Sequence, residues 1–235
     1  MLQTWSSTTF LHWAYEAETV AKQIPDGLQV DTFEGAAWVS LTPFVLTQLR
    51  PPGLPALPWI STTPETNVRT YVRGPDGKRG IWFFSLDIGR LPAVLFGRAV
   101  YFLPYMWTDM HVDEDGDRTR YAGRRRGPGE HGTYDITVQR GPAFEQEELT
   151  ELDHFLTARW VLYTFYGPIV AKSLAQHERW PLQRARVIEM QENLVAAAGL
   201  PAPVGDPLVH FASDVHVNIS RPYVVSRPSS GRPTR

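Results

Sequence analysis

The segment PETNVRTYVRG, residues 64–74, stands apart because polar and charged side chains recur at every second position. Successive side chains of a β-strand point to opposite faces of the sheet. On a strand, one face of this segment would carry Glu65, Asn67, Arg69 and Tyr71. The flanking segments PWIS and IWFFSL are apolar and rich in aromatic residues, so we predict that this polar face lines an internal pocket rather than meeting water.

A carboxyl group and a guanidinium group on one pocket wall could bind an acidic or carbonyl ligand and move a proton. Arg69 can hold a carboxylate through two parallel hydrogen bonds. Glu65 can act as a general acid or base if burial raises its pKa. The two residues lie four positions apart, about 13 Å along a strand, so each needs other partners. A charged pair costs folding free energy when it is buried, which favours a functional role.

Two further strand-like segments place histidine beside acidic or amide side chains. One face would carry Asp109, His111 and Asp113, and another would carry Asp214, His216 and Asn218. Such sets could ligate a metal ion if the two strands lay side by side. Nothing in the sequence brings them together, so we expect hydrogen-bonded structural histidines and predict no metal site.

Three loop-like motifs have simpler structural interpretations. VDEDGD at 112–117 lacks the later Gly and Glu of an EF-hand loop, so it favours a hairpin turn. The basic run RTRYAGRRR at 118–126 follows a cluster of acidic residues, so we expect a solvated strand face. GPGEHG at 127–132 has the spacing of a dinucleotide-binding loop, but the strand-like TYDITV follows it, so we expect an ordinary loop.

The composition of the 235 residues indicates a globular protein. Apolar residues make up 43% and the net charge is -2, which gives no general attraction to nucleic acid or to an anionic membrane. Cysteine is absent, which excludes disulfides, thiolate nucleophiles and Cys-ligated zinc. The first residues show no signal-peptide pattern, and no run of about 18 apolar residues occurs. We therefore predict a cytoplasmic protein with no nucleic-acid or membrane partner.

Twenty prolines and 18 glycines divide the chain into short elements, which favours strands and turns over long helices. We expect an α+β, mostly β fold, with one domain over residues 1–225 and a disordered tail at 226–235. The expected strands are 9–15, a hairpin of 28–35 with 36–49, 64–74, 81–88, a hairpin of 107–112 with 118–126, 133–141, and closing strands within 206–225. The expected helices are 16–24, 91–102, a segment starting near Thr150 and Asp153, and 184–200, where Gly199 and Pro201 end the pattern.

Six segments together resemble the uncharacterised YqjF-like family. They are FLHWAYEAETVAKQIPDGLQVDTFEGAAWVSLTPF, PETNVRTYVRGPDGKRGIWFFSLD, RAVYFLPYMW at 98–107, HFLTARWVLYT, WPLQRA and PLVHFA, and they extend from about residue 9 to residue 220. Members of that family are similar in fold to acetoacetate decarboxylases. The resemblance implies a bent antiparallel β-barrel with flanking helices and an internal pocket, and it would place Glu65, Asn67 and Arg69 at the pocket wall.

The resemblance also implies that Schiff-base chemistry is lost. Acetoacetate decarboxylases use a lysine that forms an imine with the substrate. The corresponding positions here are Tyr105 and Met106, whose side chains cannot form an imine. The chain has only three lysines, Lys22, Lys78 and Lys172. We expect the first two to be exposed, which leaves Lys172 as the one lysine that could point inward.

The resemblance completes the predicted site. The catalytic residues would be Glu65 and Tyr105, with Tyr105 donating a hydrogen bond to a carbonyl or enolate oxygen. The ligand-binding residues would be Asn67, Arg69, Tyr71, Arg98 and Tyr101. We predict a small-molecule-binding barrel without a cofactor, which takes a carboxylate or carbonyl compound and could form a homo-oligomer. Three functions stay open: an enzyme acting on an oxo- or carboxylic acid without a Schiff base, a non-catalytic carrier, sensor or stress-response protein, and a structural protein with a filled barrel.

Overall fold

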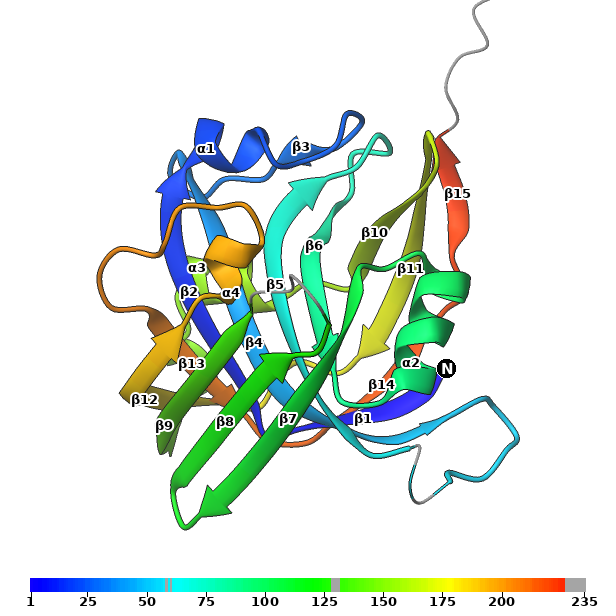
Figure 1. Ribbon diagram of the computed structural model, residues 1–235. Coiled ribbons are helices and arrows are strands. Elements are labelled where there is room, and N and C mark those ends of the chain that lie inside the picture. Colours follow the sequence, from blue (N-terminus) through cyan, green and yellow to red (C-terminus); the bar gives the residue numbers. More distant parts are fainter. Residues whose placement is uncertain (58, 60, 128–131, 227–235) are drawn as a thin grey trace, which may run out of the picture.

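The computed structural model describes residues 1–57, 59, 61–127 and 132–226 (Figure 1). The fold is mostly β, as predicted. The strands are β1 Leu2–Ser6, β2 Thr8–Glu16, β3 Gln29–Val30, β4 Ala36–Arg50, β5 Thr63–Arg73, β6 Arg79–Ile88, β7 Tyr105–Asp115, β8 Arg118–Arg125, β9 Thr133–Ala143, β10 Val161–Tyr166, β11 Ile169–His177, β12 Leu182–Glu192, β13 Leu208–Ala212, β14 Val215–Ile219 and β15 Tyr223–Ser226. The predicted loop at 128–131 and most of the predicted tail, 227–235, lie outside the described residues; Ser226 belongs to β15.

The helical elements are short. They are α1 Ala17–Ala21, α2 Leu91–Phe96, the π-helical turn η1 Gly97–Tyr101, the 3-10 turn η2 Gln146–Glu148, α3 Glu151–Thr157 and α4 Leu194–Ala197. Pro92 stands in the first turn of α2, where its missing N–H costs nothing. Thr150 and Asp153 form the capping box that starts α3, as their spacing predicts. No helix among the described residues is long and apolar enough to cross a membrane.

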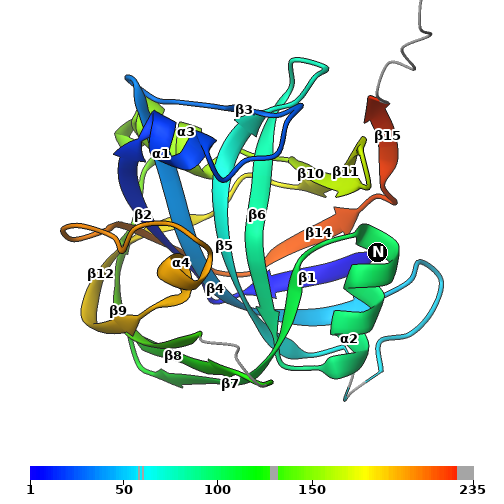
Figure 2. The same cartoon turned by 45° about the horizontal axis from the view of Figure 1, so that its top comes forward.

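The strands close into two rings that share β4, β5 and β6. One ring runs β6-β7-β8-β9-β12-β13-β2-β4-β5 and closes where β5 pairs with β6. The other runs β1-β14-β11-β10-β6-β5-β4 and closes where β1 pairs with β4. Most pairs are antiparallel, but β6 pairs in parallel with both β7 and β10. Figure 2 shows β5 and β6 between the two halves, with β1, β14 and α2 on one side and β8, β9 and β12 on the other.

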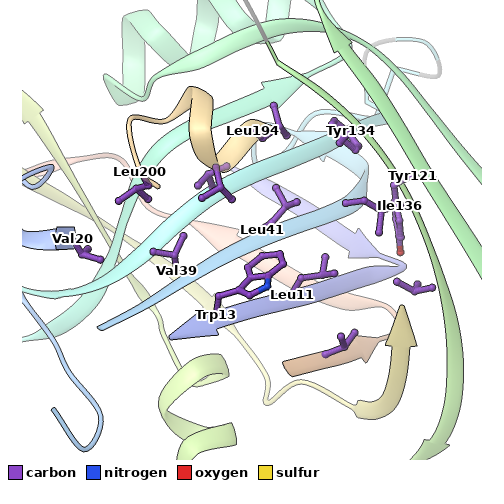
Figure 3. Close-up of a cluster of buried hydrophobic side chains, with 14 of the residues drawn as sticks. Leu11, Trp13, Val20, Val39, Leu41, Tyr121, Tyr134, Ile136, Leu194 and Leu200 are labelled. Atoms are coloured by element: carbon purple, nitrogen blue, oxygen red, sulfur yellow. The ribbon is translucent and has the colours of Figure 1, made fainter. Parts of the chain in front are cut away.

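The ring that contains β7, β8, β9 and β12 is filled by a hydrophobic core (Figure 3). Leu11 and Leu41, on β2 and β4, are fully buried in this core together with Ile136 on β9. Leu194 on α4 and Leu200 belong to the same cluster. Since protein interiors pack as densely as organic crystals, this filled ring supports one face of β4 and β5 firmly.

The helix predicted over 184–200 is wrong, because most of this segment forms strand β12 and only α4 is helical. A bulge between Val187 and Glu189 shifts the register of β12 against β9. As a result Ala185, Val187 and Met190 all pack against the core of the filled ring. Their spacing of two and then three residues imitates the spacing of a helix face.

The predicted hairpin between 28–35 and 36–49 is also wrong. Strand β3 pairs instead with the end of β5, where Val30 lies opposite Val72. Strand β4 has no free edge to offer, since β2 and β5 occupy its two sides. Among the described residues, the expected turn is reduced to a single bridge between Phe33 and Ala36. The other predicted strands, and the hairpin of 107–112 with 118–126, are present.

Candidate functional site

The second ring encloses a cavity of about 590 Å³. Its lining residues come from β1, β2, β4, β5, β6, β7, β10, β11 and β14, from α2, η1 and α3, and from the proline-rich loop after β4. Most of the lining is apolar, and the largest side chains are Trp5, Phe10, Phe44, Phe83, Phe96, Tyr101, Tyr105 and Trp180. A cavity of this size and character is typical of a small-molecule site.

The polar face of β5 forms one wall of this cavity. Glu65, Asn67 and Arg69 all line it, and all three are at least nine-tenths buried. The alternate residues face the filled ring, where Val68 joins the core and Thr66 donates a hydrogen bond of 2.8 Å to Tyr134. The alternation in the sequence therefore corresponds to the two sides of this strand, one facing the cavity and one facing the packed core.

Two predicted ligand-binding residues, Tyr71 and Arg98, do not line this cavity. The hydroxyl of Tyr71 donates to the carbonyl oxygen of Leu156 at 2.8 Å, and this side chain also neighbours Arg69, whose pKa burial lowers and Tyr71 raises. Arg98 is exposed, and its Nε donates to the backbone oxygen of Tyr105 at 2.7 Å. Tyr101, by contrast, is buried and lines the cavity.

Glu65 and Tyr105 come together, although they are forty positions apart in the chain. The Tyr105 hydroxyl donates a hydrogen bond of 3.1 Å to Oε2 of Glu65. Burial raises the pKa of Glu65 to about 8; the Tyr105 hydrogen bond opposes this rise and the nearby Asp87 adds to it. Burial and the neighbouring Glu65 likewise raise the pKa of Tyr105 well above its ordinary value. These raised pKa values favour the uncharged form of the pair at neutral pH.

Sequence reasoning missed the buried ion pair behind Glu65. Arg125 holds both carboxylate oxygens of Asp87, at 2.8 and 2.9 Å, and Thr108 donates to the same group at 2.7 Å. Arg125 was expected on a solvated face, and this expectation is wrong because its side chain is only 5% exposed. An aspartate inside the apolar segment IWFFSLDI was the signal that a buried partner had to exist.

Polar atoms without a partner gather in the cavity. Within the described part of the chain, six buried atoms of lining residues have no hydrogen-bond partner: Trp5 Nε1, Thr8 Oγ1, Thr42 Oγ1, Asn67 Oδ1, Arg69 Nε and Arg159 Nη2, the last of which forms an ion pair with Asp31 at 3.1 Å. Buried polar groups are nearly always paired, because an unpaired one costs about 1–3 kcal/mol. These atoms are concentrated around one cavity, where they are available for hydrogen bonds.

The cavity carries positive charge. No carboxylate of the described residues lies within 4 Å of the Arg69 guanidinium, which stands 5.2 Å from the centre of the Phe10 ring. Burial lowers the pKa of Arg69, partly offset by the neighbouring Tyr71. Arg159 is a second lining cation; it pairs with Asp31 at 3.1 Å, and burial lowers its pKa to about 10. With Glu65 protonated, these two guanidiniums favour an anionic ligand.

The three lysines lie outside the cavity lining. Lys172, the one candidate for an inward orientation, is buried but bonds to Asp76 and lies over the ring of Tyr223. Lys22 and Lys78 are exposed, as expected. Tyr105 occupies the cavity wall where the family resemblance placed a lysine position.

The two histidine sets remain apart, since β7 and β14 do not pair. Oγ1 of Thr4 lies 2.9 Å from Nδ1 of His216, and His111 pairs with Asp113 at 2.8 Å. Both histidines thus have the hydrogen-bonded role that was expected. Among the residues that the structure describes, no group of three His, Cys, Asp or Glu side chains could hold a metal ion.

Comparison with known proteins yields one family and a shared fold. The DUF2071 family, described as an uncharacterized conserved protein, matches residues 2–216. Uncharacterized protein YqjF of Bacillus subtilis (strain 168) is 37% identical over 212 residues, which cover 90% of this chain and 87% of YqjF.

Solved structures resemble this chain in fold. The enduracididine biosynthesis enzyme MppR complexed with pyruvate has a TM-score of 0.66 at 11% identity, over 96% of this chain and 90% of its own. An acetoacetate decarboxylase-like enzyme from Sphingomonas wittichii RW1 has a TM-score of 0.63 at 10% identity, over 96% and 93%. At such low identity these likenesses establish the fold and leave the chemistry to the residues of the cavity.

Proposed function

This chain belongs to the DUF2071 family, and we propose that it binds a small carboxylate or carbonyl compound in its cavity and acts on it by acid–base chemistry without a Schiff base. The observation that carries the proposal is the presence, in one cavity, of the hydrogen-bonded Glu65–Tyr105 pair and of Arg69, whose Nε has no partner among the described residues. The ring around the cavity would serve as a small-molecule-binding barrel.

Arg69 and Asn67 would anchor the ligand. A carboxylate can accept hydrogen bonds from the Arg69 guanidinium, whose Nε has no partner among the described residues. Such a bond is stronger than usual because the site is shielded from water. The amide of Asn67, two positions along β5, lies between the anchor and Glu65. A ligand with an acidic group and a second polar group would form hydrogen bonds with the polar side chains of this wall.

Glu65 and Tyr105 would act on the second polar group. Because the pKa of Glu65 is about 8, its carboxyl can give a proton or a hydrogen bond to a carbonyl oxygen at neutral pH. Tyr105 would stabilise the oxygen as negative charge develops. The fold-related enzyme MppR is complexed with pyruvate, an oxo acid, which supports the choice of ligand class.

A non-catalytic carrier is the second candidate function. Apolar and aromatic residues dominate the lining, which is sufficient for binding and leaves few groups for chemistry. All three lysines lie outside the lining, so the imine chemistry of acetoacetate decarboxylases has no nucleophile here.

Thermal unfolding with a panel of oxo acids, carboxylates and phenols tests the binding step. A compound at 100 times its Kd should stabilise the wild type by about 2.7 kcal/mol. Arg69→Met, which removes the charge but keeps much of the volume, should abolish this shift. Arg120→Met is the matched control, since this exposed arginine lies outside the lining and receives the same substitution. If a compound stabilises both variants equally, Arg69 is not part of the binding site.

Exchange of the hydrogens next to the carbonyl group tests the chemical step. In heavy water at about pH 8, the ionised fraction of Glu65 would take a hydrogen from the carbon next to the carbonyl group of a bound oxo acid, while Tyr105 donates a hydrogen bond to the enolate oxygen that forms. Proton NMR should therefore show catalysed exchange with the wild type and at least tenfold slower exchange with Glu65→Gln. Retained binding with no catalysed exchange in the wild type would favour the carrier.

A further inference from the structure

One side of the cavity is a continuous wall of aromatic rings. Trp5 and Trp180 are stacked, with ring centres 5.7 Å apart and planes 17° from parallel. Phe10 meets Trp180 edge to face at 5.0 Å, and Phe44 lies 5.6 Å from Trp5. All four side chains line the cavity. Aromatic pairs prefer these offset and edge-to-face arrangements, and a further ring can extend such a wall.

The aromatic wall extends from Arg69 to Glu65. At one end the Arg69 guanidinium lies over Phe10, which touches Trp180. At the other end Phe44 on β4 lies opposite Glu65 on β5. A planar group resting on the wall would therefore lie between the anion anchor and the proton donor.

The charge of the cavity decides which kind of ligand suits the wall. Aromatic walls also attract ammonium groups, but Arg69 and Arg159 line the same cavity and would repel a cation. The indole Nε1 of Trp5 is buried without a partner in the described residues, so this ring offers a donor as well as a π-face. Donors, cations and π-faces together fit an anion that carries an aromatic ring.

We propose that the cavity selects an aromatic monocarboxylate, with its carboxylate on Arg69 and its ring against Trp5 and Trp180. This inference rests on the proposed function, because it names the ligand class of the same site. The volume of about 590 Å³ corresponds to roughly 20 water-sized groups, which leaves room for a ring, a short chain and a carboxylate.

Titration calorimetry with two matched acids tests the proposal. The acids are 3-phenylpropanoate and 3-cyclohexylpropanoate, which share the carboxylate and the chain and differ in the π-system. We expect the phenyl acid to bind the wild type about 2- to 12-fold more tightly, the equivalent of about 0.5–1.5 kcal/mol for an aromatic contact. Equal or tighter binding of the cyclohexyl acid would overturn the proposal without any variant.

Substitution of a cavity tryptophan tests whether the aromatic wall causes the preference for the phenyl acid. Trp180→Leu should bring the ratio of the two dissociation constants close to one, and Trp5→Leu is the second choice if the first variant does not fold. Trp107→Leu, a half-buried tryptophan outside the lining, should keep the wild-type ratio. A wild-type preference for the phenyl acid in whichever of the two cavity variants folds would refute the assigned wall.

Failure of this proposal is distinguishable from failure of the proposed function. If short oxo acids such as pyruvate bind and neither 3-phenylpropanoate nor its cyclohexyl analogue does, the aromatic ligand class is refuted and the anion site stands. If no acid of any kind binds, both proposals fall.

Discussion

Replacing Glu65 by Gln should stabilise this protein at alkaline pH. Glu65 is only 5% exposed, and burial raises its pKa from an ordinary value of 4.5 to about 8. Above that pH the folded protein has to hold a buried carboxylate, which burial disfavours. Gln keeps the shape and can still accept a hydrogen bond from Tyr105, and it never ionises.

The magnitude follows from the linkage between protonation and folding. The folded state binds the Glu65 proton more tightly than the unfolded chain, so the contribution to stability is complete below pH 4.5 and falls as the pH rises to about 8. Each pH unit in this window costs about 1.4 kcal/mol, because one pKa unit is worth that free energy. Between pH 4.5 and about pH 8, the contribution of Glu65 to the free energy of unfolding falls by about 5 kcal/mol in total.

Urea unfolding of wild type and Glu65→Gln at pH 5, 6, 7, 8 and 9 measures this effect. The difference in unfolding free energy between wild type and variant should fall steadily up to about pH 8 and then level off, since contributions of other titrating groups cancel in the difference. In Tyr105→Phe the hydrogen bond that lowers the pKa of Glu65 is lost, so the fall should continue to higher pH. Parallel stability curves from pH 5 to 9 would refute the assignment of a protonated Glu65.

The remaining predictions concern the buried ion pair and the lysines. Arg125→Met should cost about 3–5 kcal/mol in urea unfolding because it leaves Asp87 buried and unpaired, while Arg120→Met, which breaks an exposed pair, should have little effect; equal effects would contradict the burial argument. Incubation with pyruvate and borohydride should add no mass to the protein in mass spectrometry, and an adduct mapped to Lys172 would contradict the loss of Schiff-base chemistry.

The alternation of side chains along β5 was readable from the sequence because it is a local property. The period of two and the apolar flanks placed Glu65, Asn67 and Arg69 on a shielded face, and these three residues line the cavity. Tyr71 shares that alternation, yet it does not line the cavity, and its hydroxyl bonds to the Leu156 carbonyl oxygen. Periodicity identifies a face but not how far a cavity extends along it.

Pairings between distant segments were not readable from the sequence. Arg125 bonds to Asp87, which lies 38 positions earlier in the chain. The sequence around Arg125, a basic run beside acidic residues, is typical of a solvated hairpin and gives no sign of this contact. The segment 184–200 shows the same limit, because a bulge and pairing with β9 determine its extended form. Local propensity is a weak guide where tertiary contacts decide between helix and strand.

The sharing of β5 between two rings explains why its polar face is available to a ligand. On the side of the filled ring, Val68 packs into the core and Thr66 bonds to Tyr134. On the other side, Asn67 and Arg69 lie in the cavity with atoms that have no partner in the described chain. Asn67 and Arg69 are at least nine-tenths buried, so a ligand that reaches these atoms would supply hydrogen bonds that the described chain does not. A strand in the common wall of two rings is thus supported from behind by packed core and can present unsatisfied polar groups in front, which is the preorganisation that binding and catalysis require.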